Sequence, residues 1–181
     1  QGGLLILGSI DAPAPAGAPG TILIDPVNLI IAAEGDTLDG ASSQASLTNN
    51  ILSETDLPEQ AYLWPSQFDS INGAVILEAS NDITVNGTIN RIGANNSLTM
   101  NAGNDIIVNA PMNGDDALTL SAGRDIRTSS PIQFDGLTTL TAGRDVEIGH
   151  FVASPTGITI AAGNGIRLDG GTIHPGTSIS P

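Results

Sequence analysis

Four aspartates recur at one position of a repeated sequence, and their type and spacing could support chemistry. They are Asp82, Asp105, Asp125 and Asp145, which lie 23, 20 and 20 residues apart. If the repeated segments stack, the carboxylates form a column with a spacing of about 4.8 Å. Two neighbouring carboxylates can act as acid and base when their surroundings separate their pKa values. A polysaccharide-cleaving site and a weak cation site are therefore two hypotheses for this column.

A structural role is a third hypothesis for the same column, and we favour it. Aspartate in a turn accepts hydrogen bonds from backbone amides, and nearby arginines offset its charge: Arg124, Arg127, Arg144 and Arg167. One aspartate in every repeat is typical of architecture, because a catalytic site is usually local and irregular. We therefore expect a structural turn ladder of these aspartates with Gly103, Gly123, Gly143 and Gly163, each glycine permitting a positive φ. No catalytic, metal or cofactor residue is expected.

The repeat itself predicts the fold. Five segments align on a shared Ala-Gly-Asn/Arg-Asp-like corner: 75–83, 98–106, 118–126, 138–146 and 158–166. Apolar residues alternate within each copy, which indicates short β-strands, and β-branched residues are enriched. A unit of about 20 residues buries its apolar side only by stacking on its neighbours. The chain is therefore predicted to be all-β, a parallel β-solenoid with three short strands in each coil.

Stacking aligns equivalent side chains into columns, and two columns are predicted to form the core. One contains Leu77, Met100, Leu120, Leu140 and Ile160, and the other contains Ile83, Ile106, Ile126, Val146 and Ile166.

The rest of the chain departs from this period within the same domain. Residues 1–31 are predicted to form the first β-helix coils around a loop rich in Pro, Ala and Gly. Residues 32–70 form an irregular excursion with a short helix over 56–64 that Pro65 ends, since Asp56 and Glu59 suit a helix start. Regular coils follow over 71–173, and 174–181 is predicted to be a loop-like tail.

Aromatic residues cluster in the excursion and suggest a possible binding surface. Tyr62, Trp64 and Phe68 are three of the five aromatic residues counted as Phe, Trp or Tyr. Such rings can stack on sugars or anchor a protein partner, or they can cover the end of the sheet, which we favour. His150 aligns with small residues of the other copies and is expected to face solvent, and His174 lies in the predicted tail.

Composition excludes several classes of function. Lys and Arg number 5 against 19 Asp and Glu, a formal net charge of −14, which argues against nucleic acid as a partner. The absence of cysteine excludes disulfides, thiolate metal sites and a cysteine nucleophile. No targeting segment is recognisable, and the abrupt start at Gln1 is typical of a processed product or a piece of a longer protein.

Several motifs together resemble the filamentous haemagglutinin-like exoproteins of two-partner secretion. They are the run 21–26 (Thr-Ile-Leu-Ile-Asp-Pro), the irregular stretch, the segment 75–86 and the Ala-Gly-Arg-Asp repeats. The resemblance covers roughly residues 3–170. It implies a right-handed parallel β-helix shaft, a secreted or cell-surface location in bacteria, and an outer-membrane secretion partner.

The favoured function is therefore a non-enzymatic shaft or adhesin module that holds binding regions away from the cell, with a host or matrix glycan or protein as a possible partner. An alternative is a self-assembling extracellular filament formed by head-to-tail stacking, because unpaired coil ends can template further pairing. A lesser alternative is a polysaccharide-degrading β-helix enzyme. No cofactor is indicated under any of these hypotheses.

Overall fold

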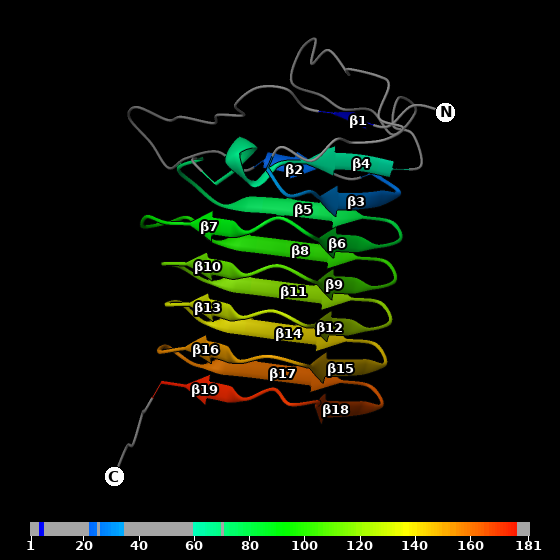
Figure 1. Ribbon diagram of the computed structural model, residues 1–181, viewed down its shortest axis with the longest axis vertical. Coiled ribbons are helices and arrows are strands. Elements are labelled where there is room, and N and C mark those ends of the chain that lie inside the picture. Colours follow the sequence, from blue (N-terminus) through cyan, green and yellow to red (C-terminus); the bar gives the residue numbers. More distant parts are fainter. Residues whose placement is uncertain (1–3, 6–21, 25, 35–59, 70, 177–181) are drawn as a thin grey trace.

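The computed structural model describes residues 4–5, 22–24, 26–34, 60–69 and 71–176. Short parallel strands stack in three sheets to form a β-solenoid, so the predicted all-β parallel β-helix is confirmed (Figure 1). Within the described ranges the one helical element is the 3₁₀ turn η1 (Pro65–Gln67). No helix among these residues is long and apolar enough to span a membrane.

Each coil contributes one strand to each sheet. The first sheet contains β2 (Ile22–Ile24), β5 (Val75–Ala79), β8 (Leu98–Ala102), β11 (Leu118–Ala122), β14 (Thr138–Ala142) and β17 (Ile158–Ala162). The second contains β1 (Leu4–Leu5), β4 (Gln60–Leu63), β3 (Asn28–Ile31), β6 (Ile83–Val85), β9 (Ile106–Val108), β12 (Ile126–Thr128), β15 (Asp145–Ile148) and β18 (Gly165–Leu168). The third contains β7 (Ile89–Arg91), β10 (Met112–Gly114), β13 (Ile132–Phe134), β16 (Val152–Ser154) and β19 (Ile173–Pro175).

Strand pairing follows the repeat predicted from the sequence. Leu120 lies beside Met100 on one side and Leu140 on the other, 20 residues away in each direction. The pairing of β5 with β8 carries the longer step of 23 residues and keeps Leu77 beside Met100. Five complete coils, each of three short strands, therefore run from β5 to β19.

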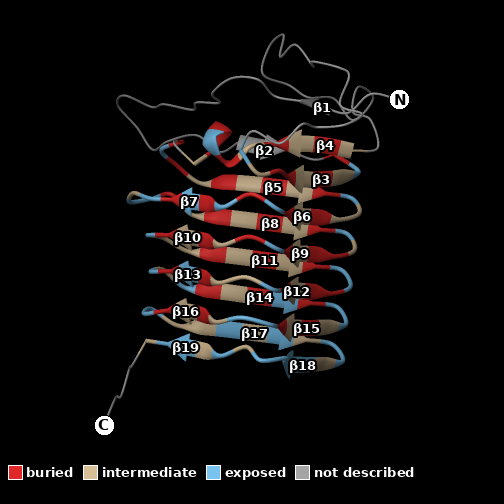
Figure 2. Cartoon of the chain, viewed as in Figure 1, coloured by how far each residue is buried: buried red, intermediate tan, exposed pale blue. Residues whose placement is uncertain are grey.

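The core fills the interior between the three sheets. Inward positions alternate with outward ones along every regular strand, and the inward residues Leu77, Met100, Leu120 and Leu140 have no exposed surface. Burial continues down the solenoid until the last coil, where β17, β18 and β19 lose their buried positions (Figure 2). The predicted core columns are confirmed through β14 and β15, whereas Ile166 in the last coil is 49% exposed.

The expected helix over 56–64 is wrong at its second half. Residues 60–63 form β4, which pairs in parallel with β3 and with β1, and residues 56–59 lie outside the described residues. Helical turn begins where it was expected to end, because Pro65 occupies the first position of η1. Alternation of buried Ala61 and Leu63 with Tyr62 satisfies the sheet, and this packing outweighs the local helix signal.

The expected tail also begins too early. His174 and Pro175 belong to β19, which pairs with β16 and completes the fifth coil. Proline is tolerated there because β19 is an edge strand of its sheet. Residues 177–181 lie outside the described part of the chain.

Residues 64–73 close the N-terminal edge of the third sheet. Phe68 and Ile71 pack into the core, each 1% exposed. Arg91 of β7 is fully buried, and its guanidinium donates hydrogen bonds to four backbone oxygens of this segment, those of Phe68, Asp69, Ile71 and Gly73. The backbone carbonyls that a further strand would have paired are thus satisfied by one side chain.

Candidate functional site

The aspartate column lies at the corner between the first and second sheets. Each carboxylate accepts a hydrogen bond from the backbone amide of the equivalent residue in the next coil. Asp82 Oδ1 accepts from Asp105 N at 3.0 Å, Asp105 Oδ1 from Asp125 N at 3.1 Å, and Asp125 Oδ1 from Asp145 N at 3.2 Å. The expected turn capping is therefore present, but it joins neighbouring coils rather than closing a turn on itself.

A second donor from the next coil reaches the same oxygen atoms. Asn104 donates to Asp82 at 2.9 Å, and Asn164 donates to Asp145 at 2.8 Å. In the middle coils arginine replaces asparagine: Arg124 Nε donates to Asp105 and Arg144 Nε donates to Asp125, both at 2.8 Å. Both arginines also pair through Nη2, so each grips its carboxylate with two nitrogens.

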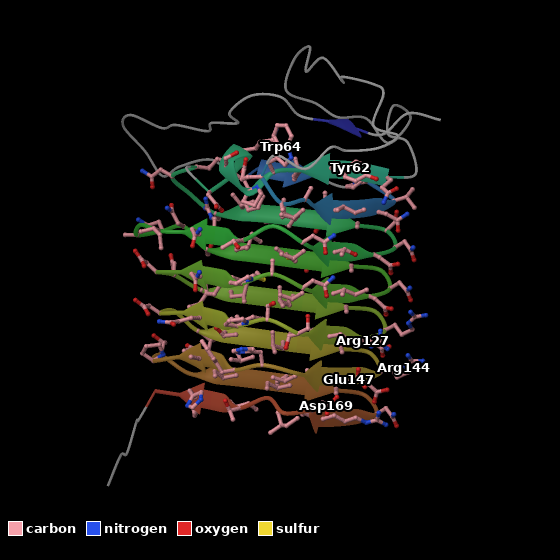
Figure 3. The ribbon with its side chains drawn as sticks, viewed as in Figure 1. Tyr62, Trp64, Arg127, Arg144, Glu147 and Asp169 are labelled. Atoms are coloured by element: carbon pink, nitrogen blue, oxygen red, sulfur yellow. The ribbon has the colours of Figure 1, made fainter. Side chains whose placement is uncertain are left out.

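Arg127 joins this column to the outer face of the second sheet, on which Figure 3 labels it with Glu147. Its Nη2 bonds Asp125 at 2.6 Å, its Nη1 lies 3.5 Å from Asp105, and its Nε bonds Glu147 at 3.1 Å. Arg167 lies 3.4 Å from the other oxygen of Glu147. Charges of opposite sign therefore alternate along the outer face from β12 to β18.

These contacts set the pKa values of the two central aspartates. Hydrogen bonds from Arg144 lower the pKa of Asp125 to about 2, against the opposing effect of burial. For Asp105, burial raises the pKa, but the bonds from Arg124 and from the amide of Asp125 outweigh it and hold the pKa below its usual range. Both carboxylates are ionised at neutral pH and neither is poised to donate a proton.

The geometry therefore supports a structural role for the column. Asp105 and Asp125 are 4% and 1% exposed, and their oxygens are occupied by amides and guanidinium groups. A general acid needs a raised pKa and access to substrate, and these carboxylates have neither. Among the described residues, no group of three or more His, Cys, Asp or Glu is placed to hold a metal ion.

The corner glycines serve a purpose different from the one expected. Gly123 does not adopt a positive φ, and neither do its counterparts Gly103, Gly143 and Gly163. A Cβ on Gly123 would lie 2.1 Å from the carbonyl oxygen of Gly103 in the preceding coil. The expectation of a left-handed corner is thus wrong, and close approach of stacked backbones is what demands glycine here. Ser80 at this position in the β5 coil is exposed.

The three clustered aromatic residues are placed differently from one another. Phe68 is 1% exposed and belongs to the core, so a ligand cannot reach it. Tyr62 points outward from β4 and is half-buried, as is Trp64 immediately before η1 (Figure 3). A role in contacting a partner or glycan remains a prediction for Tyr62 and Trp64.

The two histidines lie near each other at the third sheet. His150 is exposed, as expected, and its Nδ1 accepts a hydrogen bond from the amide of Phe151 at 2.8 Å. The ring of Phe151 packs edge-on against His150 and His174, with centroids 5.1 and 6.2 Å away. His174 also bonds Thr172 at 2.9 Å. These contacts are local packing and do not form a nucleophile–base pair.

Sequence reasoning missed the most deeply buried charges, Arg91 and Asp69. Burial lowers the pKa of Arg91, and burial raises the pKa of Asp69 to about 6 despite a 3.0 Å bond from the amide of Asn90. The charge of Arg91 opposes this rise and that of Glu34 adds to it. Arg91 replaces residues such as Gly114 and Phe134 of its column, and that mismatch is the signal that could have drawn attention to it.

Comparison with protein-family models, with curated proteins and with solved structures finds no match for this chain. The resemblance to filamentous haemagglutinin-like exoproteins therefore rests on the sequence motifs. The functional argument rests on the solenoid, its corner ladder and its two ends.

Proposed function

We propose that this chain is a non-enzymatic structural shaft, a module of a secreted bacterial surface protein that holds binding regions away from the cell. The observation that carries the proposal is the corner ladder, in which the regular carboxylates are used up in joining one coil to the next. Each bond spans two coils and the core is continuous along them. Such a wall transmits position along an axis and offers no built cavity for a substrate.

The motif resemblance supports the finer part of this proposal. A shaft of the filamentous haemagglutinin type would be exported through an outer-membrane partner and would act at the cell surface or beyond it. Tyr62 and Trp64 are then the first residues to examine for contact with a host or matrix glycan or protein, because both are half-buried aromatic residues at one end of the shaft.

Immunogold labelling of intact producing cells tests the location. Antibodies raised against this chain are expected to label intact cells as strongly as permeabilised ones. Labelling that appears only after permeabilisation would overturn the surface assignment.

A polysaccharide panel tests the absence of catalysis. The purified chain and its Asp105→Ala and Asp125→Ala variants are expected to leave every polymer of the panel intact. Depolymerisation by the native chain that either substitution abolishes would establish the enzyme alternative instead.

A second candidate is end-to-end self-assembly into a filament, and the exposed apolar residues of the last coil favour it. Head-to-tail stacking would pair this coil with the opposite end of another copy. Negative-stain electron microscopy of the purified chain distinguishes the cases, since long uniform filaments support head-to-tail stacking and short rods exclude it.

A further inference from the structure

The C-terminal coil ends all three sheets at the same level. β17, β18 and β19 are each the last strand of their sheet and pair on one side only, with β14, β15 and β16 (Figure 1). The backbone groups on their outer edges therefore have no strand partner within the described chain. Such an edge is a template for pairing with another chain.

Apolar side chains that would be core in any other coil are exposed on this edge. Ile166 and Leu168 of β18 are 49% and 52% exposed, whereas their counterparts Val146 and Ile148 in β15 have no exposed surface. Ile158, Ile160 and Ile173 are only partly buried against the core. The last coil is therefore the least covered part of the solenoid (Figure 2).

The two ends of the solenoid differ in shape. At the N-terminal end the second sheet extends two strands beyond β3, through β4 and β1, while residues 64–73 close the third sheet over Arg91. At the C-terminal end the three strands finish together. A stepped and partly closed end is a poor template for a level open one, so the open end matches best another open end.

We propose that the C-terminal coil binds the same coil of a second copy, with the two β18 strands antiparallel about a twofold axis at Leu168. Arg167 and Asp169 flank Leu168 and are both exposed. Antiparallel pairing centred on Leu168 sets Arg167 of each copy opposite Asp169 of the other, while the apolar neighbours of both strands stay inward. Arg167 is 70% exposed on the outer face, bonded on one side to Glu147, so its other donors remain free for this pairing.

Charge selects this register over its neighbours. An axis at Arg167 would oppose two guanidinium groups, and an axis at Ile166 would set Arg167 against Gly165. Like charges directly opposite each other destabilise a strand pair, whereas opposite charges stabilise it. Because the contact uses the open end of both copies, association closes at a dimer and leaves the stepped ends outward.

Sedimentation equilibrium of the 181-residue chain at about 0.15 M salt, where charges beyond ~8 Å are screened, tests the proposal. A reversible dimer is expected. A chain that stays monomeric at the highest soluble concentration, or one that forms open-ended polymers, would overturn the proposal.

A charge exchange tests the register. Arg167→Glu or Asp169→Arg alone is expected to weaken the dimer about 10-fold, because each places like charges opposite each other. The double variant R167E/D169R is expected to restore the affinity, since it exchanges the partners of both pairs. Failure of the double variant to recover would exclude this antiparallel register.

Matched substitutions of two exposed leucines test the surface. Leu168→Glu is expected to weaken the dimer at least ~100-fold, because a charge would be buried without a partner. Leu137→Glu is the control, since Leu137 is 45% exposed in the connection between β13 and β14. Equal effects of the two substitutions would argue against the C-terminal coil, and thermal melting checks that each variant is folded.

Single cysteines give a second measurement, because the chain contains none of its own. Residues facing each other across antiparallel strands lie about 4.5–5.5 Å apart between Cα atoms, within the range of a disulfide. Leu168→Cys is therefore expected to form a covalent dimer under mild oxidation, whereas Leu137→Cys is not. A slow reaction of Leu168→Cys, no faster than that of the control, would contradict the twofold axis at this residue.

Discussion

The carboxylate of Asp105 is held by the next coil: its Oδ1 lies 3.1 Å from the backbone nitrogen of Asp125 and 2.8 Å from Nε of Arg124. The same arrangement repeats one coil later, where Asp125 receives Asp145 N and Arg144. Each acceptor belongs to one coil and its donors belong to the following coil. The solenoid wall therefore has a direction, from the N-terminal coil to the C-terminal one.

Removing one central carboxylate should weaken this wall. Asp125→Ala is expected to lower the free energy of unfolding by about 2–3 kcal/mol, because charged hydrogen bonds to a buried acceptor are lost. Asp145→Ala is the matched comparison, since Asp145 lies in the next coil with a more exposed side chain, 18% against 1%. Urea denaturation measures both, and an equal loss in the two variants would contradict the importance of burial.

A methyl group at the corner should also be destabilising. In Gly123→Ala the new Cβ would meet the carbonyl oxygen of Gly103 at 2.1 Å, so the stacked coils must move apart. We expect a loss of about 1–3 kcal/mol, typical of overpacking. Gly165→Ala in the last coil is the control, because its nearest contact is an ordinary 3.4 Å to Asp145. Thermal melts in which the two variants behave alike would argue against the close approach.

The buried carboxyl of Asp69 should make stability depend on pH. Its pKa is raised to about 6 from the model-compound value of 3.8 by burial, with Arg91, Glu34 and the Asn90 amide facing it. The protonated form is therefore favoured by folding, and this contribution is fully present below pH 3.8 and lost as the pH rises through about 6.

Comparison with Asp69→Asn isolates this contribution. Between pH 4 and 7 the native chain should lose about 1–2 kcal/mol relative to the variant, a value reduced for partial solvation of the group. Asp125, with its pKa lowered to about 2, acts with the opposite sign: its contribution is present above pH 3.8 and is lost as the pH falls through 2. Parallel stability curves for the two proteins between pH 4 and 7 would refute the effect of Asp69.

Arg91 should hold the N-terminal closure in place. Arg91→Met keeps the apolar part of the side chain but removes the donors to Phe68, Ile71 and Gly73. Hydrogen exchange of residues 64–73 is expected to accelerate at least ~10-fold, since buried carbonyls lose their partners. Exchange in β11 and β14 should be unchanged, and Arg167→Met at a concentration where the chain is monomeric should alter neither region. Unchanged protection of 64–73 would show that packing alone closes this end.

The regular coils were predictable because their pattern is redundant. Leu120, Gly123 and Asp125 each recur at the same offset in neighbouring copies, so hydrophobic alternation and the 20-residue step together define both the strands and their register. The same redundancy made the role of Asp125 predictable, as a turn ligand rather than a catalyst.

The irregular end was not predictable in the same way. β4 has no repeated copy to align with, and its local sequence suits a helix start until pairing with β3 is known. Arg91 occupies a position that alternation assigns to the core, but only the carbonyls of residues 68–73 explain how a guanidinium is tolerated there. The glycine corner was assigned to the wrong cause because close approach between coils is invisible within one copy.

The directional corner ladder makes the length of this molecule an adjustable quantity. A coil needs an acceptor from its predecessor and offers one to its successor, so a block of 20 residues such as 104–123 carries a complete set of both. Duplicating or deleting such a block changes the reach of the rod by one strand spacing, about 4.8 Å, and leaves the two ends as they were. Evolution can thus tune the span of this protein in fixed increments, as a ruler is marked in equal divisions.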